Sequence, residues 1–276
     1  MANEQTKTKV VVIGGTGLIG SKVIPKLIEA GYEAVSASPE NGVNTITGEG
    51  LAEVLQGAAI VVDVSNSPSF DEKPATDFFK TSAKNLLSAE AEAEVKHHVA
   101  LSVVGTDILA SEQGGTSGYF RAKQAQEELI KESHIPYSIV HATQFFEFLK
   151  TIADVSTEGQ TVRLPPARFQ PMAADEVAEG IVRVATADPQ NGVVDIAGPE
   201  VLGLDEFVRV GLTAREDTRA VVTDATAGYF GIPIKATTLI PQGVAELGTT
   251  TFAKWLSVPA NVNPPQRAAS GSGSSR

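Results

Sequence analysis

Short apolar runs alternate with longer helical patterns up to residue 144. The runs are continuous in Val and Ile, which is typical of strands buried on both faces of a parallel sheet. They predict strands at 9–14, 33–38, 44–47, 59–64, 98–104, 137–141 and 193–196. The intervening patterns predict helices at 17–30, 50–56, 75–93, 119–133, 175–187 and 204–212. This alternation predicts an α/β fold, a doubly wound parallel sheet of the Rossmann kind.

The pattern loosens after residue 144, where Gly, Pro and Thr interrupt the apolar segments. We interpret residues 1–263 as a single domain in which about 145–170 and 198–263 form a small C-terminal substrate lobe. Open α/β sheets bind ligands at the carboxyl edge of their strands, so we expect the lobe there. Tyr229, Phe230 and Trp255 belong to it, as cleft walls or as core. Residues 264–276, PPQRAASGSGSSR, are expected to be a disordered tail or cloning remnant.

Composition narrows the class of function. The formal net charge of −11 repels nucleic-acid phosphates, and no long basic run offsets it. No apolar run is long enough for a membrane helix, and residues 1–9 do not resemble a secretory signal. With no Cys and four His, we expect no metal site; His97 and His98 are predicted to be exposed. These features favour a cytoplasmic protein, a monomer or homodimer, with no nucleic-acid or membrane partner.

The glycines between the first predicted strand and helix carry the clearest chemical signal. Gly14 permits a tight turn, Gly17 lets the main chain approach a pyrophosphate, and Gly20 lets the helix press against the sheet. Free amides at the helix start suit phosphate oxygens. The expected cofactor contacts there are Gly14, Thr16, Gly17, Leu18, Ile19 and Gly20. A merely tight turn is the alternative; the GxxxxGK[ST] pattern of nucleotide hydrolysis is missing.

The motif GGTGLIG resembles the extended and atypical short-chain dehydrogenase/reductase superfamily, most closely its NmrA-like, NAD(P)-binding branch. The resemblance covers about residues 8–212, with GVNTITGEGLAEVL, VALSVVGTD, SGYFRAK and the helix start DEVA in order. It implies that a second set of residues lines the cofactor: Val64, Ser65, Asn66, Thr143 and Phe145. A simple strand exit at 64–66, and core packing of the Phe residues at 145–148, are alternatives.

The end of the second predicted strand bears on which nicotinamide cofactor binds. A carboxylate there would hold the ribose hydroxyls of NAD and repel the 2′-phosphate of NADP. Ser36 and Ser38 occupy the strand end instead, and both can donate hydrogen bonds to a phosphate. We therefore expect NADP in preference to NAD, although both serines could simply finish a strand.

Tyr119 and Lys123 are the candidates for chemistry. Four residues apart, they share one face of a helix, and a nearby ammonium lowers the pKa of a phenol. In the superfamily such a YxxxK pair moves a proton while the nicotinamide moves a hydride, and Lys123 also binds the nicotinamide ribose. The resemblance assigns Ser102, or else Thr106, to the substrate carbonyl. The Asn of many relatives is missing; Phe79 and Thr81 stand near its place.

These residues predict an NAD(P)-dependent oxidoreductase that acts on a small carbonyl or quinone-type substrate. One alternative is a redox-sensing regulator of the NmrA-like kind, which binds NAD(P) without turnover. A second is a sugar-nucleotide epimerase or dehydratase, which the lack of an evident basic set for a second pyrophosphate disfavours.

Overall fold

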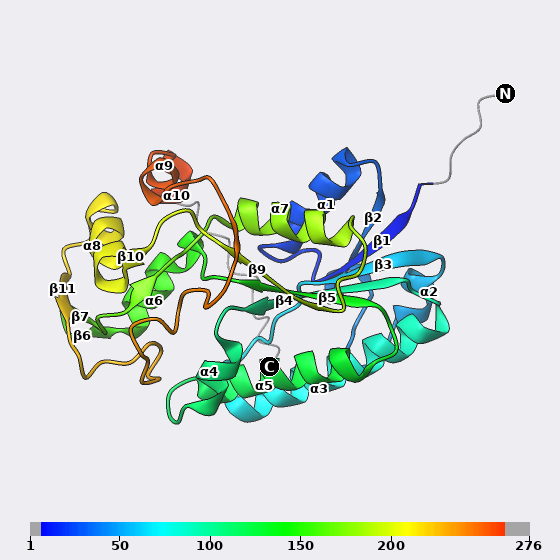
Figure 1. Cartoon of the computed structure of the whole chain (residues 1–276), viewed down its shortest axis with the longest axis horizontal. Coiled ribbons are helices and arrows are strands. Elements are labelled where there is room, and N and C mark those ends of the chain that lie inside the picture. Colours follow the sequence, from blue (N-terminus) through cyan, green and yellow to red (C-terminus); the bar gives the residue numbers. More distant parts are fainter. Residues whose placement is uncertain (1–6, 263–276) are drawn as a thin grey trace, which may run out of the picture.

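A seven-stranded sheet runs through the centre of the computed structural model, which describes residues 7–262 (Figure 1). The strand order is β12-β9-β5-β4-β3-β1-β2, and every neighbouring pair is parallel. The strands are β1 (Lys9–Ile13), β2 (Glu33–Ala37), β3 (Ala58–Asp63), β4 (His97–Val103), β5 (Tyr137–Ala142), β9 (Gly192–Ala197) and β12 (Glu246–Leu247). The predicted α/β class with a parallel sheet is confirmed.

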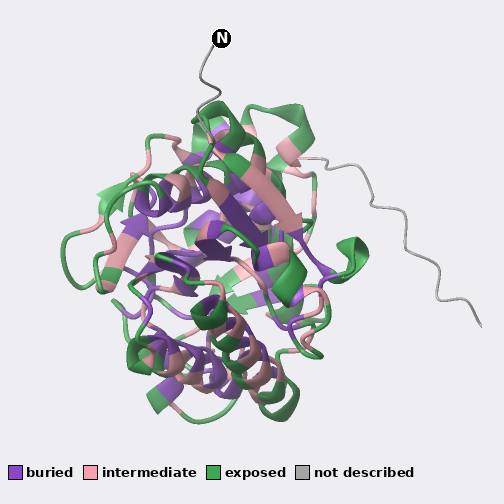
Figure 2. Cartoon of the chain, turned by 90° about the vertical axis from the view of Figure 1, so that its right-hand side faces the viewer, coloured by how far each residue is buried: buried purple, intermediate pink, exposed green. Residues whose placement is uncertain are grey.

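Helices cover both faces of this sheet (Figure 1). One face carries α1 (Gly20–Glu29) and α7 (Ala174–Ala185). The other carries α2 (Leu51–Leu55), α3 (Glu72–Glu92), α4 (Thr106–Ser111) and α5 (Ser117–Glu132). Val10, Val11 and Val12 are fully buried because successive side chains of β1 enter the cores on opposite faces. Figure 2 shows the same distribution, with buried residues along the central strands and exposed ones on the outer helix surfaces.

A smaller lobe lies beyond the carboxyl ends of the strands, on the left of Figure 1. It contains a three-stranded sheet, β11-β7-β6, and a two-stranded sheet, β10-β8. Its aromatic core includes Phe207, which packs 4.5 Å from Phe252 between ring centroids, and buried Trp255. Its elements are η2 (Phe146–Phe148), α6 (Leu149–Val155), β6 (Thr157–Glu158), β7 (Thr161–Leu164), β8 (Arg168–Phe169), β10 (Leu202–Gly203), α8 (Leu204–Ala214), β11 (Ala220–Thr223), α9 (Phe252–Leu256) and α10 (Pro259–Val262).

The prediction of a strand at residues 44–47 is wrong. These residues form a turn in which Asn44 Oδ1 accepts the amides of Ile46 at 2.9 Å and Thr47 at 3.4 Å. Gly48 N also donates to Asn44 O at 2.8 Å. Local bonds of this kind compete with a strand ladder, so β2 remains the outermost strand on this side of the sheet.

The prediction that His97 and His98 are exposed is also wrong: they are 3% and 1% exposed. Both begin β4, which lies in the middle of the sheet and is covered on both faces. His97 Nε2 lies 2.9 Å from Ser138 Oγ, and burial lowers the pKa of His97 to about 4. His98 Nδ1 contacts the buried carboxylate of Glu90 at 2.8 Å.

Several elements were not anticipated from the sequence, among them the small strands and short helices of the lobe, α4 and β12. Helix α4 follows β4 directly, and β12 brings the chain back from the lobe to pair with β9, Glu246 lying opposite Ile196. The predicted tail at 264–276 lies outside the described residues. Within residues 7–262, no helix combines the length and apolar character needed to cross a membrane.

Candidate functional site

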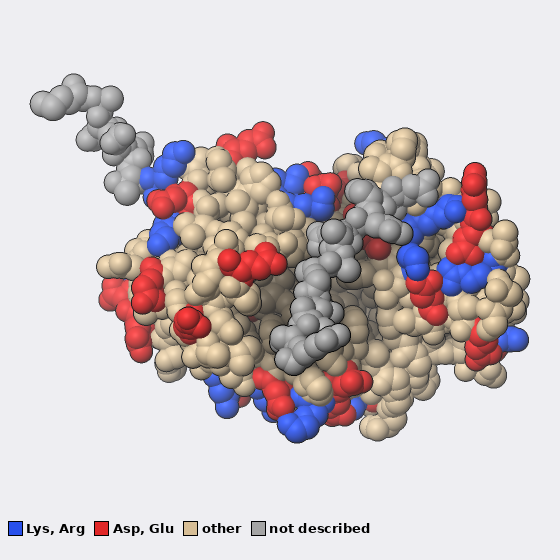
Figure 3. All heavy atoms as spheres, turned by 180° about the vertical axis from the view of Figure 1, so that it is seen from behind, with Lys and Arg blue, Asp and Glu red and all other residues tan. Residues whose placement is uncertain are grey.

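The strand order reverses at β1, because β2 lies on one side of it and β3 on the other. Open α/β sheets bind ligands at such a reversal, beyond the carboxyl ends of the strands. The loop after β1 and the loop after β3 meet there, since a Cβ on Gly14 would lie 2.9 Å from Ser65 Cα. Gly14 also has φ +77°, which a residue with a side chain rarely adopts. Figure 3 shows the surface hollowed between the sheet region and the lobe.

The turn into α1 leaves main-chain donors free. Gly17 N closes the turn onto Gly14 O at 3.0 Å. An added Cβ on Gly20 would collide with Gly14 O, so the start of the helix lies directly against the loop. Four amides donate to no other residue within 7–262: those of Thr16, Leu18, Ile19 and Gly20. These donors, at the positive end of a ten-residue helix, suit the oxygens of a diphosphate.

Buried polar side chains without partners border the same edge. Ser65 Oγ, Thr143 Oγ1 and both amide atoms of Gln144 have no hydrogen-bond partner among residues 7–262. They follow β3 and β5, whose carboxyl ends point toward the lobe. An unpaired buried polar group costs free energy, so these groups indicate a polar occupant of the site. Hydroxyl and amide groups along the same carboxyl edge of the sheet as the turn amides fit an extended polar ligand such as a dinucleotide.

The end of β2 also reaches the glycine loop. An added Cβ on Gly15 would collide with Ser36 Oγ, so Ser36 lies against the loop. Both serine hydroxyls already donate to Asn41 Oδ1, from Ser36 at 3.2 Å and from Ser38 at 2.7 Å. Asn41 belongs to η1 (Pro39–Asn41), and sequence reasoning missed it. The Pro39-Glu40-Asn41-Gly42 turn was the available signal.

Tyr119 stands at the first turn of α5, directly beside the loop after β3. Its hydroxyl donates to Asn66 Oδ1 at 2.8 Å, and its side chain is otherwise enclosed by aromatic rings. Phe70, Phe79 and Phe120 lie 5.1, 5.7 and 5.4 Å from it between ring centroids. Burial raises the pKa of Tyr119 above its ordinary value. The lowering of this pKa that was expected from Lys123 is not found.

Lys123 lies on the same face of α5, but its ammonium is bonded inward. Nζ donates to Leu101 O at 2.8 Å and to Gln126 Oε1 at 2.6 Å. It also stands 4.7 Å from the centroid of the Phe79 ring, so Phe79 contacts both Lys123 and Tyr119. With 3% exposure, burial lowers the pKa of Lys123 to about 8, although Asp63 and Glu127 act in the opposite direction.

Gln126 and Asp63 connect Lys123 to the loop after β3, at the carboxyl edge of the sheet. Sequence reasoning missed both residues. Gln126 Nε2 donates to Asp63 Oδ2 at 3.0 Å, and Asp63 Oδ1 accepts the amide of Ser65, also at 3.0 Å. The side chains of Lys123, Gln126 and Asp63 are all buried. A continuous hydrogen-bonded chain therefore runs from the ammonium of Lys123 to the loop that touches Gly14.

Ser102 belongs to a separate polar cluster. Its hydroxyl donates to Glu127 Oε1 at 2.6 Å, and His141 Nε2 lies 2.9 Å from the same oxygen. Burial of Glu127 opposes ionisation, but the hydrogen bonds from His141 and Ser102 outweigh it and lower its pKa to about 2. Thr106 Oγ1 donates to Val103 O at 2.7 Å. Both hydroxyls therefore donate to acceptors other than Tyr119.

The segment after β5 combines exposed and buried aromatics. Phe145 stacks on Phe148 with ring centroids 5.4 Å apart, whereas Phe146 is buried in the lobe core. Phe145 also bridges to Met172. Glu147 accepts the amide of Ala174 at 3.1 Å and so caps α7. Thr143 and Phe145 thus lie at the carboxyl edge, while Phe146 follows the alternative of core packing.

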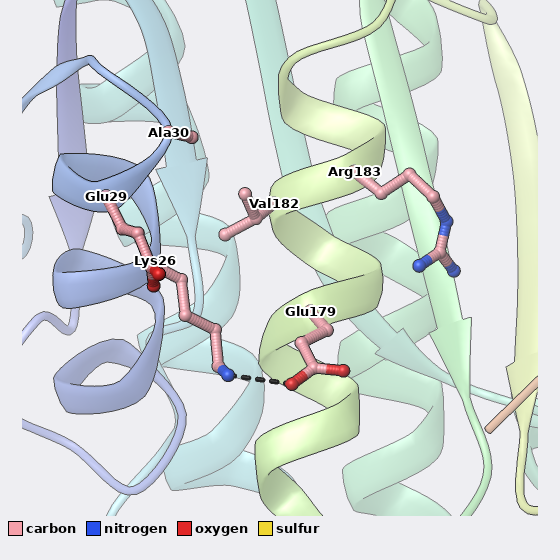
Figure 4. A pocket seen from close by; sticks show the side chains of 6 residues that line it. All are labelled: Lys26, Glu29, Ala30, Glu179, Val182 and Arg183. Atoms are coloured by element: carbon pink, nitrogen blue, oxygen red, sulfur yellow. Dashed lines mark hydrogen bonds and ion pairs between the residues drawn. The ribbon is translucent and has the colours of Figure 1, made fainter. Parts of the chain in front are cut away.

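A shallow cavity between α1 and α7 lies elsewhere (Figure 4). Its lining includes Lys26, which is bonded to Glu179 at 2.8 Å. Lys26 and Glu29 lie at the end of α1 farthest from the glycine loop, so this cavity is not part of the candidate site. No group of three His, Asp or Glu suited to a metal ion occurs in the part of the chain that the structure describes.

Comparisons with known proteins agree with this geometry. The NAD(P)H-binding family model matches residues 14–188. The photosystem II assembly factor Ycf39 of Cyanophora paradoxa is 27% identical over 154 residues. That match takes in 51% of this chain and 46% of the factor, so the chain spans about half the length of this curated relative.

Solved structures share the fold. MoeE5, in complex with UDP-glucose and NAD, has a TM-score of 0.68 at 15% identity, over 90% of this chain and 96% of that one. The dTDP-4-dehydrorhamnose reductase of Bacillus anthracis, in complex with NADP, has a TM-score of 0.64 at 16% identity, over 90% and 92%. With the glycine turn, its free amides and the family match over more than half of its length, this chain belongs to the NAD(P)H-binding family and has the fold of the extended short-chain dehydrogenases/reductases.

Proposed function

We propose that this protein is an NAD(P)-dependent oxidoreductase that reduces a small carbonyl or quinone-type substrate, with NADP preferred over NAD. The observation that carries the proposal is the 2.8 Å hydrogen bond from Tyr119 to Asn66. Asn66 follows the segment that touches Gly14, so a potential proton donor stands next to the nucleotide loops. The small-molecule substrate and a monomeric or homodimeric state are part of the same proposal.

Tyr119 suits the reductive direction. Its raised pKa keeps the phenol protonated at neutral pH, and a protonated phenol can give its proton to a substrate oxygen. When bound, the nicotinamide supplies the hydride. Lys123 lies on the same face of α5 and, with its pKa lowered by burial to about 8, carries a positive charge at neutral pH. The Gln126–Asp63 chain holds that charge in place.

The preference for NADP rests on the end of β2. Ser36, Ser38 and Asn41 are neutral, and the nearby carboxylate, Glu40, is exposed. Without a fixed negative charge beside the adenosine ribose, a 2′-phosphate meets no repulsion. Titration of both reduced cofactors tests this preference, and tighter binding of NADH than of NADPH would contradict it.

The enzyme proposal is tested with Tyr119→Phe, which keeps the aromatic packing and removes only the hydroxyl. We expect the parent to oxidise NADPH with a panel of aldehydes and quinones. The variant should lose at least about tenfold in turnover, equivalent to roughly 1.4 kcal/mol, while its NADPH affinity changes little. Equal rates for parent and variant would remove Tyr119 from the mechanism.

A redox-sensing binder is the second candidate, and one observation favours it. Both hydrogen bonds of the Lys123 ammonium go to the protein interior, and Ser102 is engaged with Glu127. A protein that binds NAD(P) without turnover needs only the glycine turn and its neighbours. Tight binding of either cofactor, with no turnover across the panel, would support this candidate over the enzyme.

A further inference from the structure

Phe70 is a large apolar side chain that is 47% exposed at the carboxyl edge of the sheet. It lies in the loop between β3 and α3, four residues after Asn66. Its ring is 5.1 Å from that of Tyr119 and 6.3 Å from that of Phe230, the latter in a stacked arrangement at 30°. One loop of the sheet region and one segment of the lobe therefore build a continuous aromatic wall, Phe70–Phe230, beside the ring of Tyr119.

The backbone holds Phe230 in an unusual conformation. Its φ is +50°, which is rare for an aromatic residue and persists only where the surroundings enforce it. Tyr229 and Ile232 exchange two main-chain hydrogen bonds across it, at 2.8 and 2.9 Å. Phe230 O accepts the amide of Thr116 at 3.2 Å, so the segment is also fixed to the loop that precedes Tyr119.

The glycines before Tyr119 make this contact possible. An added Cβ on Gly115 would collide with Phe230 O and with the main chain of Gly231. Gly115 therefore lets the lobe segment approach the start of α5 closely enough to place Phe230 against Phe70. The glycine-rich loop before the helix is thus used to position an aromatic ring.

From this arrangement we infer that the site recognises a planar, uncharged aromatic carbonyl compound, with Phe70 and Phe230 as the residues that select the flat ring. The inference rests on the proposed function and names its substrate class. Aromatic rings gain from stacked or edge-to-face contact beyond the area they bury, whereas a puckered aliphatic ring of equal size does not. The aromatic wall and the adjoining ring carry no charge at neutral pH, which favours a neutral ligand. These rings are Phe70, Phe230 and Tyr119.

A matched pair of substrates tests this selection. Benzaldehyde and cyclohexanecarbaldehyde have the same carbon skeleton size but differ in flatness. With the full chain and NADPH, we expect kcat/KM to favour benzaldehyde by at least about tenfold. Phe70→Leu and Phe230→Leu should each reduce this ratio at least about threefold, because leucine retains apolar bulk without a ring face. Tyr32→Leu, at the opposite edge of the sheet, should leave the ratio unchanged.

A binding measurement separates this inference from the enzyme proposal. Benzamide and cyclohexanecarboxamide are unreactive analogues whose binding to the protein with NADP⁺ is followed by ligand-observed NMR, with thermal unfolding as a check on each variant. Benzamide should bind more tightly, and the two leucine variants should abolish the difference. If benzamide binds more tightly, the variants abolish the difference and no aldehyde is turned over, the aromatic site stands and the enzyme proposal fails. Equal binding of the two amides, or an unchanged difference in both variants, overturns the inference.

Discussion

The glycine turn and the Tyr119 face of α5 lie at the same edge of the sheet but differ in how their polar groups are satisfied. At the turn, the amides of Thr16, Leu18, Ile19 and Gly20 have no partner within residues 7–262, and neither has Ser65 Oγ. On α5, the polar atoms of Tyr119, Lys123 and Gln126 are bonded to other residues of the protein.

This difference separates a region that can bind a ligand directly from one whose hydrogen bonds must first change. Unpaired donors at the turn are compensated when an anionic ligand arrives, so binding there requires no rearrangement of side chains. Tyr119, in contrast, must exchange Asn66 for a substrate oxygen before it can donate its proton. The turn therefore presents free donors to a nucleotide, whereas the chemistry depends on a hydrogen-bond exchange at Tyr119.

The largest expected effect comes from closing the glycine turn. In Gly14→Ala the new Cβ would stand 2.9 Å from Ser65 Cα and separate the two loops. We expect NADPH affinity to fall about a hundredfold, roughly 2.7 kcal/mol, as measured by calorimetric titration. Gly31→Ala is the matched control, because Gly31 also has positive φ but has no atom within 4 Å of the added carbon. A similar loss in both variants would mean that backbone strain, not the contact, is responsible.

The buried chain on α5 predicts a loss of stability that is specific to its members. Gln126→Leu removes one hydrogen bond from the buried Lys123 ammonium and one from the buried Asp63 carboxylate, which should cost about 2 kcal/mol of the free energy of unfolding. Urea denaturation at pH 7 measures this cost. Gln124→Leu, on the same helix with an exposed hydrogen bond, should change stability by less than about 0.5 kcal/mol. Equal losses would show that the chain has no special role.

His97 predicts a pH dependence of stability of comparable size. Burial lowers its pKa from 6.5 to about 4, so between these values the unfolded chain binds more protons than the folded one. The stabilising contribution is present above pH 6.5 and is lost as the pH falls through 4. Relative to His97→Gln, the parent should lose about 2 kcal/mol between pH 7 and 5, measured by urea denaturation. Parallel curves for the two proteins would contradict a neutral, buried His97.

The smallest expected effect concerns the choice of cofactor. Asn41→Asp keeps an acceptor for Ser36 and Ser38 and adds a negative charge beside the glycine loop. We expect the ratio of NADPH to NADH affinity to fall about fivefold, roughly 1 kcal/mol of repulsion at a partly exposed site. Glu40→Gln serves as the control, since Glu40 is exposed and should contribute little. An unchanged ratio in Asn41→Asp would place the 2′-phosphate elsewhere.

The features that the sequence predicted well are those set by local pattern. Continuous Val runs marked β1 and β3, and the spacing of Gly14, Gly17 and Gly20 marked the turn, because strand burial and turn geometry depend on neighbouring residues. The turn at 44–47 was mistaken for a strand because the Asn44 side chain outweighs a short apolar pattern.

The side-chain partners could not be predicted in the same way. Gln126 meets Asp63 across 63 residues, and Ser102 meets Glu127 across 25. No spacing in the sequence reports such pairs, which form only when α5 packs on the sheet. The same packing directs Lys123 toward Leu101 O and buries His98 against Glu90, so both departures from expectation have a tertiary cause.

Hydrogen exchange tests the central claim that main-chain amides at the β1–α1 turn hold the diphosphate of the cofactor. With saturating NADPH, we predict strong protection of the amides of Thr16, Leu18, Ile19 and Gly20, which have no partner within residues 7–262. Val11 and Val12, inside the sheet, serve as references that are already protected. Bound NADPH with no change in exchange at the four turn amides would contradict the account.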